Sequence, residues 1–348
     1  MPIRTAKAAI LARSREPLVV DEITLPEELG VGQVLVKVLY STICGAQINE
    51  IAAAKGPDKF LPHLLGHEAS AQVVEIGPGV TNVKPGDTVV LHWRPSLGIQ
   101  CAPPAYKWRG EKLNAGWVTT FNDYAVISEN RMTRIAPDYD LRTAPLLGCA
   151  VTTAAGVINN DANVKIGESV VVFGVGGVGL NVVQFAQLAG AYPIVAIDLV
   201  DSKLEMARAR GATHCLNPTA IADLDAEIRS IVGAKGPDKV IETTGAKSVI
   251  ELAYNLTNAD GTCVLVGVPS EKVTIYTLPI HFNKVLTGSH GGDAVPQVDI
   301  PRLIRLNQAG RLSFEGIITH EFPLDDINIA LDVVRGGTAG RVVLKVAA

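Results

Sequence analysis

The chain has 348 residues, enough for about two domains with a sizeable core. Hydrophobic residues make up 47% and charged residues 19%, and the formal net charge is −4, which excludes a disordered chain and argues against a nucleic-acid-binding surface. Five cysteines are an odd and widely spaced set, typical of thiols or metal ligands in a reducing compartment rather than of a disulfide framework. The cysteine pattern leads us to expect a cytoplasmic protein. The N-terminal apolar run, residues 8–12, is too short for the core of a signal peptide.

The first part of the chain has the pattern of a β domain. Short runs rich in Val, Ile and Leu, such as residues 33–39 and 71–76, are bounded by turns at residues 77–79 and 84–87 that contain Gly and Pro. The pattern predicts an irregular, mainly-β domain over residues 1–155.

The middle of the chain, residues 156–290, alternates between strand and helix patterns. The expected strands lie at residues 170–173, 194–197, 239–241 and 263–266, and the expected helices near 179–189 and 202–210. This alternation predicts an α/β domain with a doubly wound parallel sheet. The tail, residues 291–348, returns to short helices and a final strand at 341–346, and we expect it to complete the first domain.

One segment, residues 169–197, contains no charged residue and is long enough to cross a membrane. Five glycines and Pro193 divide it into a β-branched run, a turn, a helical stretch and a second β-branched run. A buried βαβ unit explains this division into strand, turn, helix and strand better than a membrane span does.

The turn in that segment has the spacing of a dinucleotide site. Gly174, Gly176 and Gly179 fit G-x-G-x-x-G between a strand and a helix, where the glycines make the tight turn, admit a pyrophosphate and let helix and strand pack closely. Asp198 ends the next strand, where a carboxylate accepts hydrogen bonds from the ribose hydroxyls and repels a 2′-phosphate, so NAD is favoured over NADP. The alternative is a Gly-rich turn followed by a surface Asp. Lys203 lies either along the ribose or in solvent.

Three residues of soft-ligand type stand in Gly-rich surroundings of the β domain: Cys44, His67 and Cys149. Two thiolates and an imidazole would leave zinc an open position for substrate, as a catalytic site requires. The spacing leaves an alternative open, in which each is a buried thiol or a hydrogen-bonded histidine.

Several short sequence motifs, spread over nearly the whole chain, occur together in one known protein family. They are Gly66-His67-Glu68, residues 80–87 (VTNVKPGD), residues 148–153 (GCAVTT), the glycine turn with Asp198, residues 242–245 (ETTG) and residues 318–320 (ITH). Together they resemble the zinc-dependent medium-chain dehydrogenase/reductase family of alcohol and polyol dehydrogenases, over nearly the whole chain. The resemblance implies a GroES-like catalytic domain and a Rossmann coenzyme domain.

The resemblance also implies roles for single residues. It makes Cys44, His67 and Cys149 the ligands of one catalytic zinc per chain, with Glu68 as a nearby acid that exchanges onto the metal. Trp93 and Trp117 are expected to line the substrate pocket. The residues expected to bind the coenzyme are Thr153 and Val178 beside the nicotinamide, Val268 lining its pocket, Arg341 on the pyrophosphate, and Gly174, Gly176, Gly177, Gly179, Asp198 and Lys203.

The chain departs from the family pattern at three places. The stretch 93–117, where relatives carry a structural zinc on four cysteines, holds only Cys101 and must be held by something other than metal. Ala46 replaces the Ser or Thr that starts the usual proton relay. Gln47 replaces the Asp that commonly orients the zinc histidine, and Asn49 stands where a histidine is sometimes found.

We therefore expect a zinc- and NAD-dependent dehydrogenase that interconverts an alcohol, of polyol, cyclitol or sugar-alcohol type, with its ketone or aldehyde by hydride transfer. One alternative is a zinc-free NADPH quinone or enoyl reductase of the same broad family, and another is a non-catalytic NAD-binding protein. The expected partner is a small molecule, without nucleic acid or membrane, and the resemblance suggests a homodimer or homotetramer.

Overall fold

The computed structural model describes residues 3–347. The chain divides into two compact units, residues 1–149 with 295–348, and residues 150–294. The expected functional domains, a catalytic domain over residues 1–155 and 291–348 and a coenzyme domain over residues 156–290, stay a prediction. Within the described residues, none of the helices combines the length and the apolar character that a membrane span needs.

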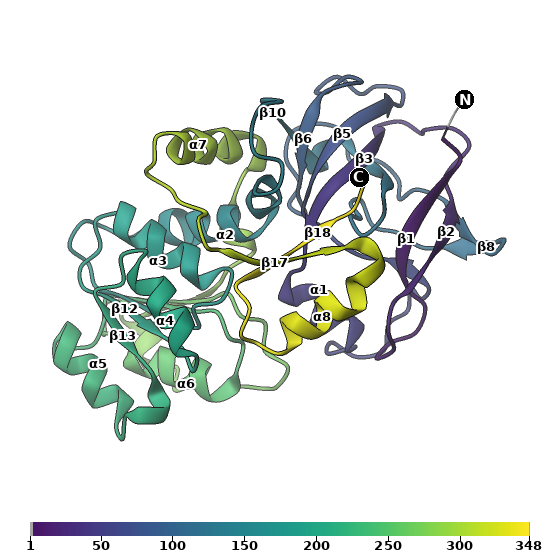
Figure 1. Cartoon of the computed structure of the whole chain (residues 1–348). Helices are drawn as coiled ribbons and strands as arrows, with labels where there is room; N and C mark the ends of the chain where they lie inside the picture. Colours follow the sequence, from purple (N-terminus) through teal and green to yellow (C-terminus); the bar gives the residue numbers. More distant parts are fainter. Residues whose placement is uncertain (1–2, 348) are drawn as a thin grey trace. The chain divides into compact units, whose positions relative to one another are not determined.

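The first unit is built on two sheets (Figure 1). The five-stranded sheet has the order β4 (His63–Leu64), β1 (Thr5–Leu11), β2 (Val19–Thr24), β7 (Tyr106–Trp108) and β8 (Glu111–Leu113). The seven-stranded sheet has the order β10 (Met132–Ile135), β6 (Thr88–Leu91), β5 (Ala69–Ile76), β3 (Gln33–Thr42), β18 (Arg341–Lys345) and β17 (Ile318–Pro323), and β9 (Tyr124–Ser128) also pairs with β3. On β3, alternate residues Val34, Val36 and Val38 enter the core, as the two-residue period of a strand requires.

The α-helices of this unit, among the described residues, are α1 (Gly45–Ile51), α7 (Pro296–Gln308) and α8 (Ile327–Arg335). Helix α8 buries Ile327 and Leu331 in the same cluster as Leu344 of β18. Strand β18 pairs antiparallel with β3, with Val343 opposite Thr42. The end of the chain is thus held at the end of β3, next to the start of α1.

The second unit contains a six-stranded sheet in which every pair is parallel. Its order is β13 (His214–Leu216), β12 (Ile194–Ile197), β11 (Val170–Phe173), β14 (Lys239–Glu242), β15 (Thr262–Leu265) and β16 (Val285–Gly288). Counted along the chain this is 3-2-1-4-5-6, the doubly wound dinucleotide-binding order, which confirms the expected fold class. Its helices are α2 (Ala150–Gly156), α3 (Gly179–Leu188), α4 (Asp201–Arg208), α5 (Leu224–Val232) and α6 (Lys247–Leu256) (Figure 1).

Strands β11 and β12 explain the long uncharged segment. All four residues of each strand are buried, because central parallel strands are covered on both faces and therefore have continuous apolar sequences. The strand order reverses between β11 and β14, and ligands of such sheets bind at the carboxyl ends of strands at this point.

The turn after β6 is held by a buried histidine of the first unit. The Nδ1–H group of His92 donates to the carbonyl of Arg94 at 2.8 Å, and Nε2 accepts from the Thr133 hydroxyl at 3.0 Å. Burial lowers the pKa of His92 to about 4. The folded protein therefore keeps this ring neutral in a range where the unfolded chain, with an ordinary pKa near 6.5, takes up a proton.

This difference predicts acid destabilisation. Because the unfolded state binds the extra proton below pH ~6.5, the free energy of unfolding falls as the pH is lowered toward 4, by about 2 kcal/mol between pH ~7.5 and ~5 from His92 alone. His92→Asn keeps a donor for the Arg94 carbonyl but does not titrate. The free energy of unfolding of this variant should therefore fall by about 2 kcal/mol less than that of the wild type between pH ~7.5 and ~5. Urea unfolding at the two pH values measures it, with the exposed His320→Asn as control. An equal pH dependence in wild type and His92→Asn would contradict the assignment.

Candidate metal centre and coenzyme site

The structure brings three predicted ligands together in the first unit. The ligand atoms of Cys44, His67 and Cys149 all lie within 4.8 Å of one another. Cys44 is the N-cap of α1, His67 lies between β4 and β5, and Cys149 follows a short 3-10 helix, residues 144–148. Gly66 has φ +86°, and a Cβ there would collide with Thr120 and Phe121, so the turn before His67 requires glycine.

Gln47 links two of these ligands. Its side-chain oxygen accepts the backbone N–H of Cys44 at 3.0 Å, and its amide nitrogen lies 2.5 Å from Nδ1 of His67. The other ring nitrogen of His67, Nε2, is buried and has no hydrogen-bond partner among the described residues. Because Nδ1 is taken by Gln47, Nε2 is the nitrogen left to bind a metal.

Glu68 is not one of the clustered ligands in this structure. One of its carboxylate oxygens instead forms a buried ion pair with Arg341. Arg341 also donates to the Thr42 hydroxyl at 3.0 Å, whereas the second carboxylate oxygen of Glu68, Oε2, has no hydrogen-bond partner within residues 3–347. The expected contact of Arg341 with a pyrophosphate stays a prediction. In the structure, Glu68 lies beside the guanidinium of Arg341. The sequence motifs did not indicate this partner.

The charges of this cluster are strongly perturbed. A hydrogen bond from the Cys149 thiol holds the pKa of Cys44 well below its usual range, and His67 contributes in the same direction. The pKa of Cys149 is raised because its proton is shared with Cys44. Burial raises the pKa of Glu68, while the charge of Arg341 opposes this. The opposite shifts of the two thiol pKa values thus reflect the hydrogen bond between Cys44 and Cys149.

The donor set fits zinc. Two sulfurs and an imidazole nitrogen are preferred zinc ligands, and three protein ligands leave the fourth tetrahedral position for a substrate. The unpartnered Nε2 of His67 supports this, because a buried polar atom without a partner is costly unless something binds it.

In the second unit, the glycine turn has the geometry of an anion cradle. Gly174 has φ +83°, and a Cβ on Gly179 would collide with the carbonyl oxygen of Gly174. A Cβ on Gly176, in contrast, would meet nothing within 4 Å. Since the protein itself does not require glycine at 176, the space there fits the close approach of a pyrophosphate to the N-terminus of α3.

Asp198 and Thr243 hold this turn. The Asp198 carboxylate accepts the backbone N–H groups of Val175 at 2.8 Å and Val200 at 3.1 Å. The Thr243 hydroxyl lies 2.8 Å from the carbonyl oxygen of Gly174. Sequence reasoning did not single out Thr243, although its place directly after β14, beside β11 in the sheet, was the signal available.

The other expected coenzyme residues also lie in the second unit. Thr153 is on α2, Val178 is the N-cap of α3, and Lys203 is in the first turn of α4. Val268 follows β15 and is 57% exposed, and its carbonyl packs against Gly245 so closely that a Cβ there would meet it at 2.7 Å. Gly177 lies in the turn itself. Their contacts with a coenzyme stay predictions.

The two expected substrate-pocket residues lie in the first unit. Trp93 follows β6 and is half-buried, and Trp117 is 40% exposed with its indole N–H donating to the carbonyl of Cys101 at 3.1 Å.

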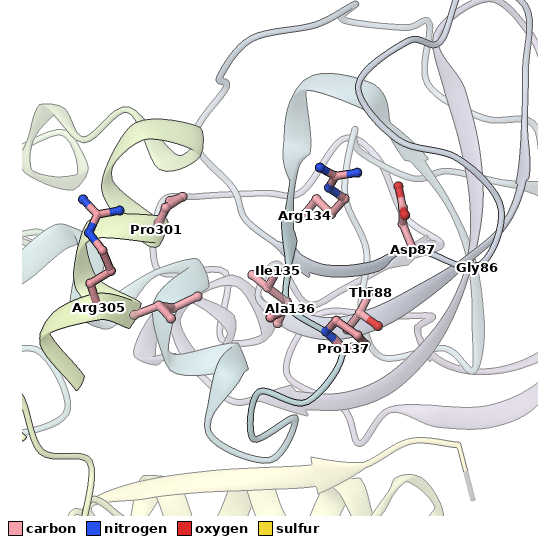
Figure 2. Close-up of a pocket in the computed structure, with 10 residues that line it drawn as sticks. Gly86, Asp87, Thr88, Arg134, Ile135, Ala136, Pro137, Pro301 and Arg305 are labelled. Carbon is pink, nitrogen blue, oxygen red and sulfur yellow. The ribbon is translucent and has the colours of Figure 1, made fainter. Parts of the chain in front are cut away.

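A separate pocket of about 560 Å³ lies between β10 and α7, with Arg134 and Arg305 at its sides (Figure 2). It contains none of the predicted site residues.

Comparison with known proteins identifies the family. A sequence profile described as alcohol dehydrogenase GroES-like domain matches residues 30–137, and one described as zinc-binding dehydrogenase matches residues 177–309. S-(hydroxymethyl)glutathione dehydrogenase of Paracoccus denitrificans is 32% identical over 97% of this chain and 99% of its own length. Alcohol dehydrogenase 1 of Pisum sativum is 30% identical over 97% and 96%. The chain therefore belongs to the zinc-type medium-chain dehydrogenase/reductase family.

Solved structures agree. An alcohol dehydrogenase zinc-binding domain protein from Burkholderia ambifaria has a TM-score of 0.90 and 28% identity, covering 99% of this chain and 100% of its own. Benzyl alcohol dehydrogenase from Acinetobacter calcoaceticus has a TM-score of 0.89 and 27% identity, with the same coverage. The comparisons confirm the expected enzyme class, an oxidoreductase of the zinc alcohol dehydrogenase type.

The position of Gln47 predicts an unusual effect on zinc affinity. A histidine that binds metal through Nε2 carries its proton on Nδ1, which then faces the amide N–H groups of Gln47, donor against donor. Gln47→Glu offers an oxygen to both Cys44 N–H and His67 Nδ1–H, so it should bind zinc about tenfold more tightly.

Competition with a chromogenic chelator measures this affinity. Gln72→Glu adds the same charge at an exposed position of β5 and serves as the control. If Gln47→Glu bound zinc no better than wild type, the proposed donor conflict would be wrong.

Proposed function

We propose that the protein catalyses reversible hydride transfer between an alcohol and NAD, with one zinc ion held by Cys44, His67 and Cys149. The observation that carries this proposal is the convergence of these three ligand atoms within 4.8 Å. A dinucleotide site alone requires none of them.

Each residue near the ligands has a separate task in the proposed reaction. A zinc ion bound there supplies a Lewis acid that favours loss of the alcohol proton. Gln47 lies against Nδ1 of His67 and leaves Nε2 to the metal, and Arg341 neutralises Glu68, so that the second oxygen of Glu68 stays available beside the ligands. This arrangement supports the expected role of Glu68 as an acid that exchanges onto the metal.

The coenzyme is proposed to be NAD, which accepts the hydride. The glycine turn would hold the pyrophosphate, and Asp198 would face the adenosine ribose. Its carboxylate is fixed by two backbone N–H groups, so a 2′-phosphate brought to the same place would meet a negative charge that cannot turn away.

Ala46 bears on the substrate class. It removes the hydroxyl that starts the usual relay, so the alcohol proton leaves through another group: water, the nicotinamide ribose or Glu68. A second hydroxyl next to the reacting one, as in a polyol, cyclitol or sugar alcohol, would help to carry this proton. We therefore propose that alcohols with a vicinal hydroxyl are the favoured substrates.

The two alternative functions are less well supported. A zinc-free NADPH reductase has no use for the clustered cysteines and histidine, and Asp198 opposes NADPH. A non-catalytic NAD-binding protein would have no reason to keep these three ligand atoms together. The reaction class proposed above accounts for both sites.

We also propose a homodimer or homotetramer joined through the second unit, and a cytoplasmic location. Strand β16 is at the edge of the parallel sheet, and beside it in sequence Tyr276, Leu278, Ile280 and Phe282 are between 41% and 75% exposed. An unpaired strand edge next to exposed apolar side chains suits a second copy of the chain. The five cysteines are all free, as a reducing compartment favours.

Coenzyme choice gives one test. Asp198→Asn keeps the size of the side chain and one acceptor oxygen but removes the charge, so the ratio of kcat/KM for NAD to that for NADP should fall about tenfold or more. Steady-state kinetics with both coenzymes measure it, and Asp201→Asn, an exposed acid on α4, is the control. A wild-type enzyme equally efficient with NAD and NADP would show that Asp198 does not select the coenzyme.

The reaction itself is tested by following NAD reduction with polyols, cyclitols, their phosphates and simple primary alcohols. We expect turnover that a zinc chelator abolishes, with vicinal diols ahead of ethanol. Ala46→Ser installs a relay hydroxyl and should help simple alcohols more than polyols, because proton transfer by a positioned group contributes about 10²–10⁴-fold. Equal effects on both classes, or ethanol matching the best polyol, would refute substrate assistance; no turnover with any alcohol would refute the function.

A further inference from the structure

The stretch 93–117 lacks the four cysteines of a structural zinc site. Hydrogen bonds from another segment of the first unit hold it in place instead. The short 3-10 helix Glu129–Arg131 contacts it at several points. The buried Glu129 carboxylate accepts the backbone N–H of Ile99 at 2.8 Å and those of Thr81 and Asn82 at 2.7 and 2.9 Å. Asn130 exchanges backbone hydrogen bonds with the same stretch, accepting from Ser96 and donating to Ile99.

Arg131 makes the contacts that reach the two tryptophans. Its Nη1 donates to the carbonyl of Trp93, and its Nη2 donates to the side-chain oxygen of Gln100 at 3.0 Å. Its guanidinium carbon lies 5.1 Å from the centre of the Trp117 ring. One side chain therefore joins the two ends of the stretch.

The surroundings of Arg131 are unusual for a charge. The side chain is buried, and within residues 3–347 it forms no ion pair with a carboxylate, so its charge is balanced only by carbonyl dipoles and an aromatic face. A buried cation without a carboxylate is costly. An apolar side chain would avoid that cost, but it would make none of the directed contacts with Trp93 and Gln100.

We propose that Arg131 is a positioning residue for the alcohol pocket, which fixes Trp93 and Trp117 in a single arrangement. The proposal rests on the proposed function and on the expectation, from the family resemblance, that these two tryptophans line the substrate pocket. Arginine is suited to this task because its planar fork donates in two directions while its face stacks on an indole, whereas lysine offers only a point charge.

The test compares Arg131→Met with Arg131→Lys and with Arg109→Met. Arg109 provides a matched control, since it lies in the same stretch and stacks on Trp108 at 4.6 Å, but it is exposed and bonds Asp21 rather than the two pocket tryptophans. For each variant, KM for the alcohol, KM for NAD, kcat, zinc content and acrylamide quenching of tryptophan fluorescence are measured.

For Arg131→Met we expect a rise of about tenfold in KM for the alcohol, with KM for NAD and zinc content unchanged and stronger quenching. Arg131→Lys should lie between wild type and Arg131→Met, and it keeps the test open if Arg131→Met does not fold. Arg109→Met should alter fluorescence while KM for the alcohol stays the same.

An unchanged KM for the alcohol in Arg131→Met or Arg131→Lys would overturn the proposal. A joint loss of zinc, NAD binding and turnover in Arg131→Lys would overturn it as well, because that indicates general unfolding rather than positioning. A wild-type protein that oxidises no alcohol would instead refute the proposed function, and this outcome is separate from the effect of the variants.

Discussion

The buried ion pair between Glu68 and Arg341 joins residues 273 positions apart, and the metal centre depends on it. Glu68 is the neighbour of His67, and Arg341 begins β18. Removing one partner of such a pair leaves the other charge buried and unpaired, at a cost of about 3–5 kcal/mol. Strand β18 lies between β3 and β17 and carries Arg341 to Glu68, so residues 295–348 bring a contact to the metal centre of the first unit.

The same pair sets the chemistry around the ligands. Arg341 compensates the charge of Glu68, and the hydrogen bond between the two thiols lowers the pKa of Cys44 and raises that of Cys149. Binding of zinc is linked to proton release, as for any thiolate site. Gln47 adds no charge of its own, in contrast to the Asp usual in the family, so the affinity of this centre rests more heavily on the two thiols.

Much of this could be predicted from the sequence. Strands such as Val170–Phe173 were found because their buried β-branched runs end at glycines, and Cys44, His67 and Cys149 were found because each lies in a recognisable local motif. Strand β16 was missed, since its half-exposed residues have no strand-like alternation.

The contacts of Gln47, Arg131 and Arg341 were beyond sequence reasoning for a different reason. They join side chains that are distant along the chain or turned by local backbone geometry, and neither hydrophobic periodicity nor a motif encodes them. The absence of cysteines in the stretch 93–117 indicated that some other support was needed, but only the structure shows that residues 129–131 provide it.

If Cys44, His67 and Cys149 together hold one zinc ion, elemental analysis of the purified, dialysed protein should find about one zinc per chain. In Cys44→Ser and His67→Ala the metal should be lost, while NAD binding measured by fluorescence titration remains. Zinc retained in both variants, or about two zinc per chain released only on unfolding, would contradict this assignment of the ligands.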